Sequence, residues 1–232
     1  MARKTRSVED SKSARTRERI LDSAAYVLSR KGFAGTRLTD VAEHAQLQAP
    51  AIYYYFKSRE ELIEEVMVVG AQRICAHVVE ALDALPSDIR PIDRILTAVE
   101  AHLRFVLVTS EYTTAATRNG GQLPDHLRDR HEAERTAYGD VWRELFTDAA
   151  AAGELKPDLD AGATRMLVIG ALNWTVEWWD STRGSIDALV RTAQSIVMGG
   201  ISAPETTSGI IDTSPAKPAR TRSPRRKKTV TA

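Results

Sequence analysis

The segment from Thr36 to Leu62, TRLTDVAEHAQLQAPAIYYYFKSREEL, constrains the fold of this 232-residue chain more than any other. In its first half, apolar residues recur at i, i+1 and i+4, which gives a short helix one apolar face. In its second half, from Ala49 to Phe56, two large apolar residues lie four apart and share the face that meets the first helix. The segment therefore predicts two short helices joined by a tight turn. The positions that set this pattern are Val41, Ala42, Ala45, Leu47, Ile52 and Phe56.

The opposite side of the second helix carries residues suited to contacts outside the fold. At about 100° per residue, Tyr54 lies opposite the apolar pair, and Tyr53 and Tyr55 lie on its flanks. Three consecutive tyrosines cannot all be core residues, although they could be no more than amphipathic residues on a half-exposed helix. Lys57 and Arg59 follow, where cations can reach nucleic-acid phosphates. This arrangement is typical of a helix-turn-helix, which presents side chains to the DNA major groove.

The same segment resembles the signature of the TetR family of bacterial repressors, which is roughly G-x-x-x-T-x-x-x-x-I-A-x-x-A-G-V-S-x-G-x-[LI]-Y-x-H-F-x-x-K-E-x-L. Three residues depart from it: Gln46 replaces the turn glycine, Gln48 the capping serine, and Tyr55 the histidine. We expect Gln46 to carry a left-handed backbone, at a cost on the order of 1 kcal/mol. The residues that match, some of them conservatively, are Gly32, Thr36, Val41, Ala42, Ala45, Leu47, Ile52, Tyr53, Phe56, Arg59, Glu60 and Leu62.

The resemblance implies a set of DNA contacts. Arg37 is the candidate for a bidentate guanine contact, whereas Pro50 and Ala51 can offer only apolar contact to a thymine methyl group. We therefore expect Arg37→Ala to relax discrimination at one guanine and Arg59→Ala to weaken binding to all sequences alike. The implied base-facing residues are Arg37, Thr39, Gln48, Pro50, Ala51 and Tyr54, the implied phosphate contacts are Tyr53, Lys57 and Arg59, and Tyr55 occupies the histidine position between them.

Hydrophobic periodicity and helix-ending residues predict an all-α chain of about nine helices, three of which form the DNA-binding head. The first helix is centred on residues 20–28 and ends near Gly32. The six helices that follow the head are expected over 60–85, 92–108, 113–118, 124–152, 160–180 and 185–200. Of these, the eighth helix of the chain is expected to be capped by Asp160, and the ninth to begin at Ser185. The predicted divisions are a basic N-terminal arm (1–15), a helix-turn-helix domain (16–62, motif 39–58), a helical ligand-binding and dimerisation domain (63–202) and a disordered basic tail (203–232).

Charge is distributed unevenly along the chain. Residues 1–62 hold 12 Lys and Arg against 8 Asp and Glu, residues 63–202 hold 13 against 21, and residues 203–232 hold 7 against 2. A basic head attached to an acidic body fits a protein whose body stays clear of DNA phosphates. The basic arm is a candidate for phosphate or minor-groove contact. The basic tail is either simply solvated or a nonspecific tether to DNA.

The resemblance also implies a homodimer, in which the last two long helices, the eighth and ninth, pair with their copies in a four-helix bundle. Met166, Ile169, Gly170, Asn173 and Trp174 give the eighth helix a broad apolar face with small residues, enough for both an interior and a partner. Twofold symmetry also follows from groove geometry, because two heads must read half-sites about one helical turn apart.

The effector is expected to be a small hydrophobic molecule. The run NWTVEWW resembles a W-x-x-x-W-[YW] pattern of TetR-family regulators of fatty-acid and sterol breakdown in actinobacteria, many of which release DNA on binding an acyl-CoA. Core packing is the alternative explanation of these tryptophans, and a regulator of drug efflux or of an unrelated pathway would bind a different effector. The residues that could line an elongated apolar pocket are Phe105, Trp142, Trp174 and Trp178.

Other classes of function are less compatible with the sequence. The five histidines show no metal-ligand spacing and are interpreted as surface residues, and no G-x-S-x-G or glycine-rich phosphate loop is present, so neither an enzyme nor a cofactor or metal is expected. Cys75 is expected to be a small buried residue without a partner. The longest apolar stretch is too short to span a bilayer, which favours a cytoplasmic protein. An architectural DNA-binding protein would explain the basic ends but not the acidic helical body.

Overall fold

The computed structural model describes residues 2–109 and 111–204, and the regular elements in these ranges are all helices, joined by turns and loops, without a strand. The predicted all-α class is confirmed. The helices are α1 (Ala2–Gly35), α2 (Leu38–His44), α3 (Ala49–Ile52), α4 (Arg59–Asp83), α5 (Pro91–Arg104), α6 (Glu111–Asn119), α7 (Arg128–Ala151), α8 (Ala161–Trp178) and α9 (Ile186–Ile201). A π-helical turn, Phe105–Thr109, extends α5, and short 3₁₀ turns precede α7 and α9. The expected tail, 203–232, lies outside the described residues from 205 onward.

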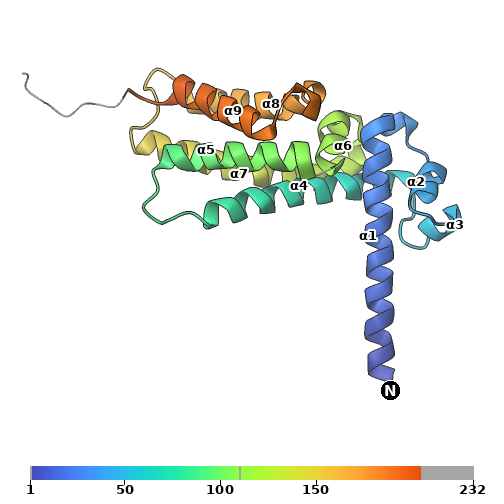
Figure 1. The fold of residues 1–232 in the computed structure, drawn as a ribbon. Coiled ribbons are helices and arrows are strands. Elements are labelled where there is room, and N and C mark those ends of the chain that lie inside the picture. Colours follow the sequence, from blue (N-terminus) through green and yellow to red (C-terminus); the bar gives the residue numbers. More distant parts are fainter. Residues whose placement is uncertain (1, 110, 205–232) are drawn as a thin grey trace, which may run out of the picture.

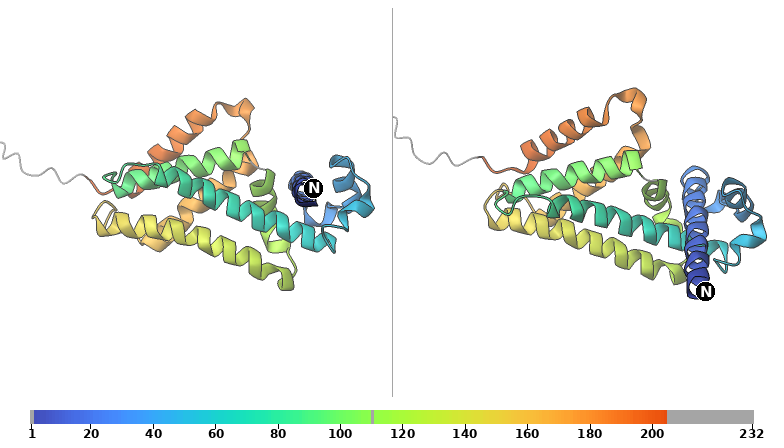
Figure 2. Two further views of the ribbon diagram at one scale, coloured as in Figure 1. Left: turned by 90° about the horizontal axis from the view of Figure 1, so that it is seen from below. Right: turned by 60° about the horizontal axis from the view of Figure 1, so that its bottom comes forward.

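The helices form a small head and an elongated body (Figure 1). In the body, α4, α5 and α7 run side by side, α8 and α9 lie along them, and α6 stands between the body and α1 (Figures 1 and 2). Two apolar cores follow this division: one between α1–α4 and α6, and a larger one between the distal part of α4 and α5, α7, α8 and α9.

Several helix boundaries have the local causes that the sequence indicated. Asp160 accepts a hydrogen bond from Ala163 N at 2.6 Å and caps α8, and Ser185 accepts one from Ala188 N at 3.2 Å and caps α9. Ser58 caps α4 in the same way through Glu61 N. Gly32 breaks α1 with a φ of 68°, a left-handed conformation that glycine adopts without steric cost. The regular part of the first helix thus ends at Gly32, as predicted.

Two elements of the head differ from expectation. The basic arm is not separate from the first helix, because α1 begins at Ala2 and its N-terminal half projects beyond the other helices (Figure 1). The second motif helix is shorter than the predicted 49–56: α3 ends at Ile52, and Tyr55 and Phe56 continue it only through tight turns to Ile52 O. Three consecutive tyrosines have low helix propensity, which favours the early end, whereas Pro50 lies in the first turn, where no amide donor is needed.

Candidate functional site

The helix-turn-helix is anchored from inside as the sequence indicated. Ile52 is fully buried and Phe56 is 2% exposed, and both pack with Val41 of α2 in the head core. On the other side of the turn, Tyr54 is 82% exposed and Tyr53 59% exposed. Because Ile52 and Phe56 hold this turn in place, the two exposed tyrosines can enter a DNA groove without unfolding the head.

Most of the residues implied by the family resemblance lie on the outer surface of the head. Tyr55 is an exception because its ring is half-buried, packs against the head core and meets Tyr54 edge-on at 5.1 Å between centroids. Ala51 is also half-buried. The predicted residues with exposed side chains are Arg37, Thr39, Gln48, Pro50, Tyr53, Tyr54 and Lys57.

Arg59, the third predicted phosphate contact, makes several contacts within the head. Its guanidinium donates hydrogen bonds to the carbonyl oxygens of Phe33 and Thr36 and lies 4.7 Å from the centroid of the Phe33 ring. Its Nε also donates to Glu60 at 3.0 Å. Arg59 therefore joins the start of α4 to the end of α1, and its charge is already engaged within the head.

We expect Arg59→Ala to lower the free energy of unfolding by about 2 kcal/mol, because two carbonyl groups lose a charged donor. Lys57→Ala is the matched control: Lys57 is exposed, so its removal should weaken DNA binding and leave the melting temperature unchanged. Chemical denaturation and DNA titration of both variants measure the difference. An Arg59→Ala protein with wild-type stability and uniformly weaker DNA binding would restore the phosphate-contact interpretation.

Gln46 has a φ of 54°. This is the left-handed backbone expected at the position where the family signature has its turn glycine. Replacing Gln46 by glycine should relieve the steric cost, and the more flexible unfolded chain should offset part of the gain. We expect Gln46→Gly to raise the free energy of unfolding by about 0.5 kcal/mol. Gln48, with a φ of −85°, provides the control, since Gln48→Gly should not stabilise the protein in the same urea titration.

The head is joined to the body by polar contacts between α1 and α6. Glu111 accepts hydrogen bonds from Ser29 at 2.7 Å and from Arg30 at 3.0 Å. Tyr112 donates to Asp22 at 2.7 Å, and Asn119 accepts the Phe33 amide at 2.8 Å. A movement of α6 would therefore be transmitted directly to the helix that carries the head.

The four predicted effector-contacting residues do not converge. Phe105 and Trp142 are buried in the body core, with exposures of 6% and 0%. Trp174 and Trp178, in contrast, are 65% and 42% exposed. The two groups separate because α8 turns Leu172 and Thr175 inward, which directs the tryptophan face of the helix outward. The single pocket suggested by the sequence is therefore not formed within one chain.

The body core contains a buried polar group that was not predicted, which we term the polar core cluster: His102 on α5 with Tyr138 and Trp142 on α7. His102 Nδ1 lies 2.8 Å from the Tyr138 hydroxyl oxygen, and the imidazole meets the Trp142 indole edge-on at 6.2 Å between centroids. His102 is fully buried, so the interpretation of all five histidines as surface residues was wrong. His131 is buried as well. The signal was available, because His102 follows Ile95 and Val99 at helical spacing on the apolar face of α5.

Burial lowers the pKa of His102 to about 4, and the nearby Asn173 side chain offsets part of that shift. Burial likewise raises the pKa of the Tyr138 hydroxyl, so both groups are uncharged at neutral pH. Asn173 is a side-chain hydrogen-bond partner of His102, and the Tyr138 hydroxyl is one of the Trp142 indole, although neither His102 Nε2 nor Trp142 Nε1 makes a hydrogen bond of ideal geometry within the described ranges. Half-buried Cys75 of α4 lies near Glu134, and burial raises its thiol pKa.

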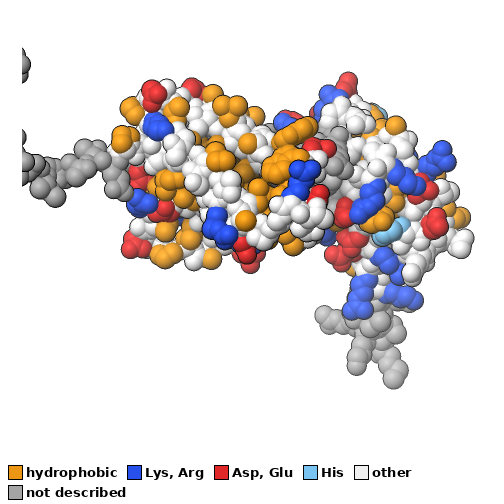
Figure 3. Space-filling model, turned by 45° about the horizontal axis from the view of Figure 1, so that its top comes forward, with side chains coloured by type: hydrophobic (Ala, Val, Ile, Leu, Met, Phe, Trp, Pro, Cys, Tyr) orange, Lys and Arg blue, Asp and Glu red, His pale blue; other side chains and the backbone are white. Residues whose placement is uncertain are grey.

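The outer side of α8 and α9 exposes large apolar side chains. Figure 3 views the molecule from this side, with orange apolar side chains between the charged ones. Gly170 of α8 and Gly199 of α9 are small residues with open space beside them, because no neighbouring atom lies within 4 Å of where a Cβ atom would be. The exposed apolar residues on this side are Met166, Leu167, Trp174, Trp178 and Ile196, with exposures of 59%, 74%, 65%, 42% and 68%.

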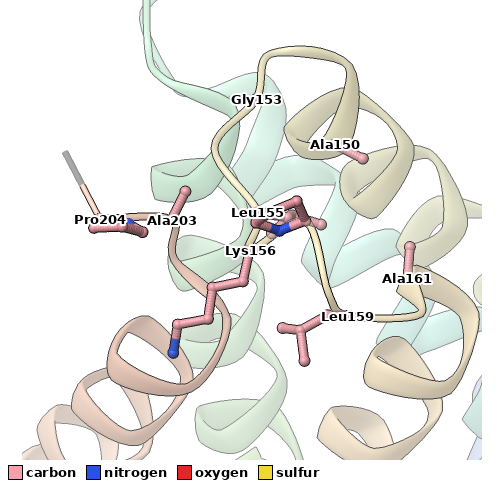
Figure 4. Close-up of a pocket in the computed structure, with 9 residues that line it drawn as sticks. Ala150, Gly153, Leu155, Lys156, Leu159, Ala161, Ala203 and Pro204 are labelled. Atoms are coloured by element: carbon pink, nitrogen blue, oxygen red, sulfur yellow. The ribbon is translucent and has the colours of Figure 1, made fainter. Parts of the chain in front are cut away.

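A surface hollow of about 490 Å³ lies at the end of the body remote from the head (Figure 4). Its lysine, Lys156, is already engaged, because Nζ donates to Gly199 O at 2.8 Å and Gly200 O at 2.9 Å at the end of α9. The backbone bridge between Leu155 and Ser202 closes the same corner. This hollow thus lies where the α7–α8 loop is bonded to the end of α9, and its polar groups serve that contact.

Within residues 2–109 and 111–204, no group of three or more His, Cys, Asp or Glu side chains is arranged to hold a metal ion. None of the helices in these ranges combines the length and apolarity needed to cross a membrane.

Comparisons with known proteins agree with this architecture. The family model for bacterial regulatory proteins of the tetR family matches residues 20–66, and that for the tetracyclin repressor-like C-terminal domain matches residues 88–201. The HTH-type transcriptional repressor KstR2 of Mycolicibacterium smegmatis is 25% identical over 200 residues, covering 82% of this chain and 93% of that protein.

Two solved structures show the same fold. The ketosteroid transcriptional regulator KstR2 of Mycobacterium tuberculosis superposes with a TM-score of 0.71 at 19% identity, covering 81% of this chain and 95% of that one. AibR in complex with isovaleryl coenzyme A and operator DNA superposes with a TM-score of 0.70 at 19% identity, covering 78% of this chain and 96% of that one. The chain belongs to the TetR family of bacterial regulators, and it is a ligand-responsive, DNA-binding transcriptional regulator rather than an enzyme.

Proposed function

We propose that this protein is a cytoplasmic homodimeric repressor that binds a palindromic operator and is released by a small hydrophobic effector of the acyl-CoA class. The observation that carries the DNA-binding part is the contrast between Tyr54, 82% exposed, and Ile52, fully buried on the other side of the same turn. Arg37, Thr39 and Gln48 are exposed on this side of the head and provide the polar groups for base contacts.

The proposed dimer forms through α8 and α9. The support is the outer apolar face of these helices, where Leu167 and Trp174 are mostly exposed in the single chain. Monomeric proteins rarely leave such patches uncovered. A bundle of four helices, two from each protomer, would bury this face and hold two heads about one helical turn of DNA apart, roughly 34–36 Å.

The effector class is supported by similarity to AibR, whose structure holds isovaleryl coenzyme A. CoA phosphates require a cation near an apolar site. Arg165 of α8 meets this requirement, because it donates to Gly139 O at 3.3 Å, next to Tyr138, and forms no ion pair within the described residues. Arg104, in contrast, is already paired with Glu100 and Asp187. An apolar drug-like effector is the alternative, and it would not require Arg165.

Operator binding is tested by footprinting the DNA upstream of the gene itself and its neighbours. We expect protection of a discrete palindrome, whereas uniform coating of the DNA would favour an architectural protein. On the protected site, Arg37→Ala should lose about 1–3 kcal/mol of discrimination at one guanine. Titrations against a panel of operators with single mismatches measure this loss, and an equal loss on every sequence would refute the assignment of Arg37.

A further inference from the structure

One carboxylate of α4 joins three helices at the boundary between the head and the body. Glu65 Oε1 accepts a hydrogen bond from Arg17 of α1 at 2.6 Å, and Oε2 accepts one from Arg130 of α7 at 3.0 Å. We propose that Glu65 is a positioning residue for DNA binding, through which α7 holds the DNA-binding turn in the orientation that fits the operator. This inference goes beyond the proposed function and does not depend on the class of effector.

On the head side, Arg17 connects Glu65 to the base of the helix-turn-helix. Its guanidinium carbon lies 5.2 Å from the centroid of the Phe56 ring, within the range of a cation–π interaction. Phe56 is buried in the head core and lies two residues after the exposed Tyr54. The Arg17 side chain is itself 43% exposed, so without a partner it would sample other rotamers in water. The bond to Glu65 therefore keeps a cation against the residue that anchors the exposed turn.

On the body side, Arg130 lies in the first turn of α7 and is shared by two neighbouring carboxylates. Besides its bond to Glu65, the guanidinium forms an ion pair of 3.5 Å with Glu64, which is buried. Arg130 thus fixes the second oxygen of Glu65 from a helix that belongs to the body. If α7 shifts, Glu65 loses this support and holds Arg17 less rigidly.

Burial distinguishes this network from a surface ion pair. Burial alone would raise the pKa of Glu65, but the hydrogen bonds from Arg17 and Arg130 lower it below its usual value, so the carboxylate is ionised at neutral pH. Charged hydrogen bonds to a largely buried carboxylate restrict geometry more than exposed pairs do, and many exposed pairs contribute nothing measurable. The pair Glu132–Arg135 on α7 is of the exposed kind, with its charged atoms 3.3 Å apart, and it provides a matched control.

The sign of one substitution separates positioning from general electrostatics. Glu65→Gln removes a negative charge, which by itself should strengthen the attraction to DNA phosphates. We expect the opposite, a loss of operator affinity of about tenfold, because the loosened turn must be ordered when it binds DNA. Arg130→Gln should cause a similar loss, and the double variant should bind no more weakly than Glu65→Gln alone.

Fluorescence-anisotropy titrations of the full-length protein measure these affinities on the duplex protected in the wild-type footprint. They are repeated at several salt concentrations, and the salt dependence should keep its wild-type slope because Glu65 and Arg130 are not proposed to contact phosphates. Arg130→Lys keeps a donor to Glu65 and should retain most of the affinity that Arg130→Gln loses. Circular dichroism establishes that each variant is folded at the temperature of the titration, so a merely structural role would lower the melting temperature without lowering affinity.

Glu132→Gln and Arg135→Gln are the control variants, since they remove the same charges from the exposed pair and should change affinity by less than about twofold. Operator binding by Glu65→Gln that equals or exceeds that of the wild type, additive losses in the double variant, or an equal loss in the control variants would overturn the proposal. Footprinting of the wild type reports separately on the proposed function, because it shows whether a discrete palindrome is protected before any variant is compared.

Discussion

Leu167→Glu is expected to convert the protein from a dimer to a monomer and to reduce operator affinity by about 100-fold or more. Leu167 lies on the outer apolar face of α8 and is 74% exposed in the single chain. A monomeric fold therefore tolerates the new carboxylate, whereas the proposed bundle would bury it without a partner at a cost of several kcal/mol. The operator loss follows because two linked heads bind far more tightly than separate ones. Analytical ultracentrifugation and operator titration measure both effects.

Ala137→Glu is the matched control for this experiment. Ala137 is exposed on α7, outside the proposed dimer face, so the same new charge should leave both the oligomeric state and the operator affinity unchanged. A Leu167→Glu protein that remains a dimer with normal operator binding would show that the subunits associate through another surface. Helix content, measured by circular dichroism, confirms that each variant is folded.

Stability should decrease as the pH falls from 7 to 5, and His102 should account for about 2 kcal/mol of that decrease. The pKa of its side chain is about 4 in the folded protein and 6.5 in the unfolded chain. Between these values the unfolded chain binds a proton that the folded protein does not bind, so acidification favours unfolding. The contribution is present in full above pH 6.5 and is lost progressively down to about pH 4. Urea unfolding at pH 7 and pH 5 measures it.

His102→Phe should remove this part of the pH dependence, whatever its effect on stability at pH 7. His126→Asn serves as the control, because it replaces an exposed imidazole outside the body core. The buried His131, whose pKa is also lowered, mainly by burial, should contribute a smaller effect of the same sign. Parallel pH profiles for the wild type and His102→Phe would show that His102 is protonated as easily in the folded protein as in the unfolded chain.

The head could be predicted closely because its signals are local. The spacing of Val41, Ile52 and Phe56 determined which sides face inward, and the resemblance to the TetR signature, which has a glycine at this turn position, implied the left-handed backbone of Gln46. The role of Arg59 could not be predicted in this way, because its partners, Phe33 and Thr36, are more than 20 residues away in sequence. A charge beside a DNA-binding motif is ambiguous until its distant partners are known.

The effector region was predicted less well, and for a related physical reason. Periodicity placed Trp174 and Trp178 on one face of α8, but it could not decide whether that face meets the core of its own chain or remains outside. His102 was assigned to the surface because a single histidine carries no motif. Its spacing after Ile95 and Val99 on α5 indicates a buried position, whereas its partner, the Tyr138 hydroxyl of α7, became visible only when the two helices were packed together.

The amino-acid sequence by itself determined the helical class, the helix caps at Asp160 and Ser185, and the inward and outward sides of the DNA-binding motif, because all of these depend on residues within a few positions of each other. Only the tertiary structure decided which cations are already engaged, which tryptophans lie outside, and which side chains pair with the buried His102. Those properties depend on contacts between helices far apart in the chain, and local patterns contain no information about such contacts.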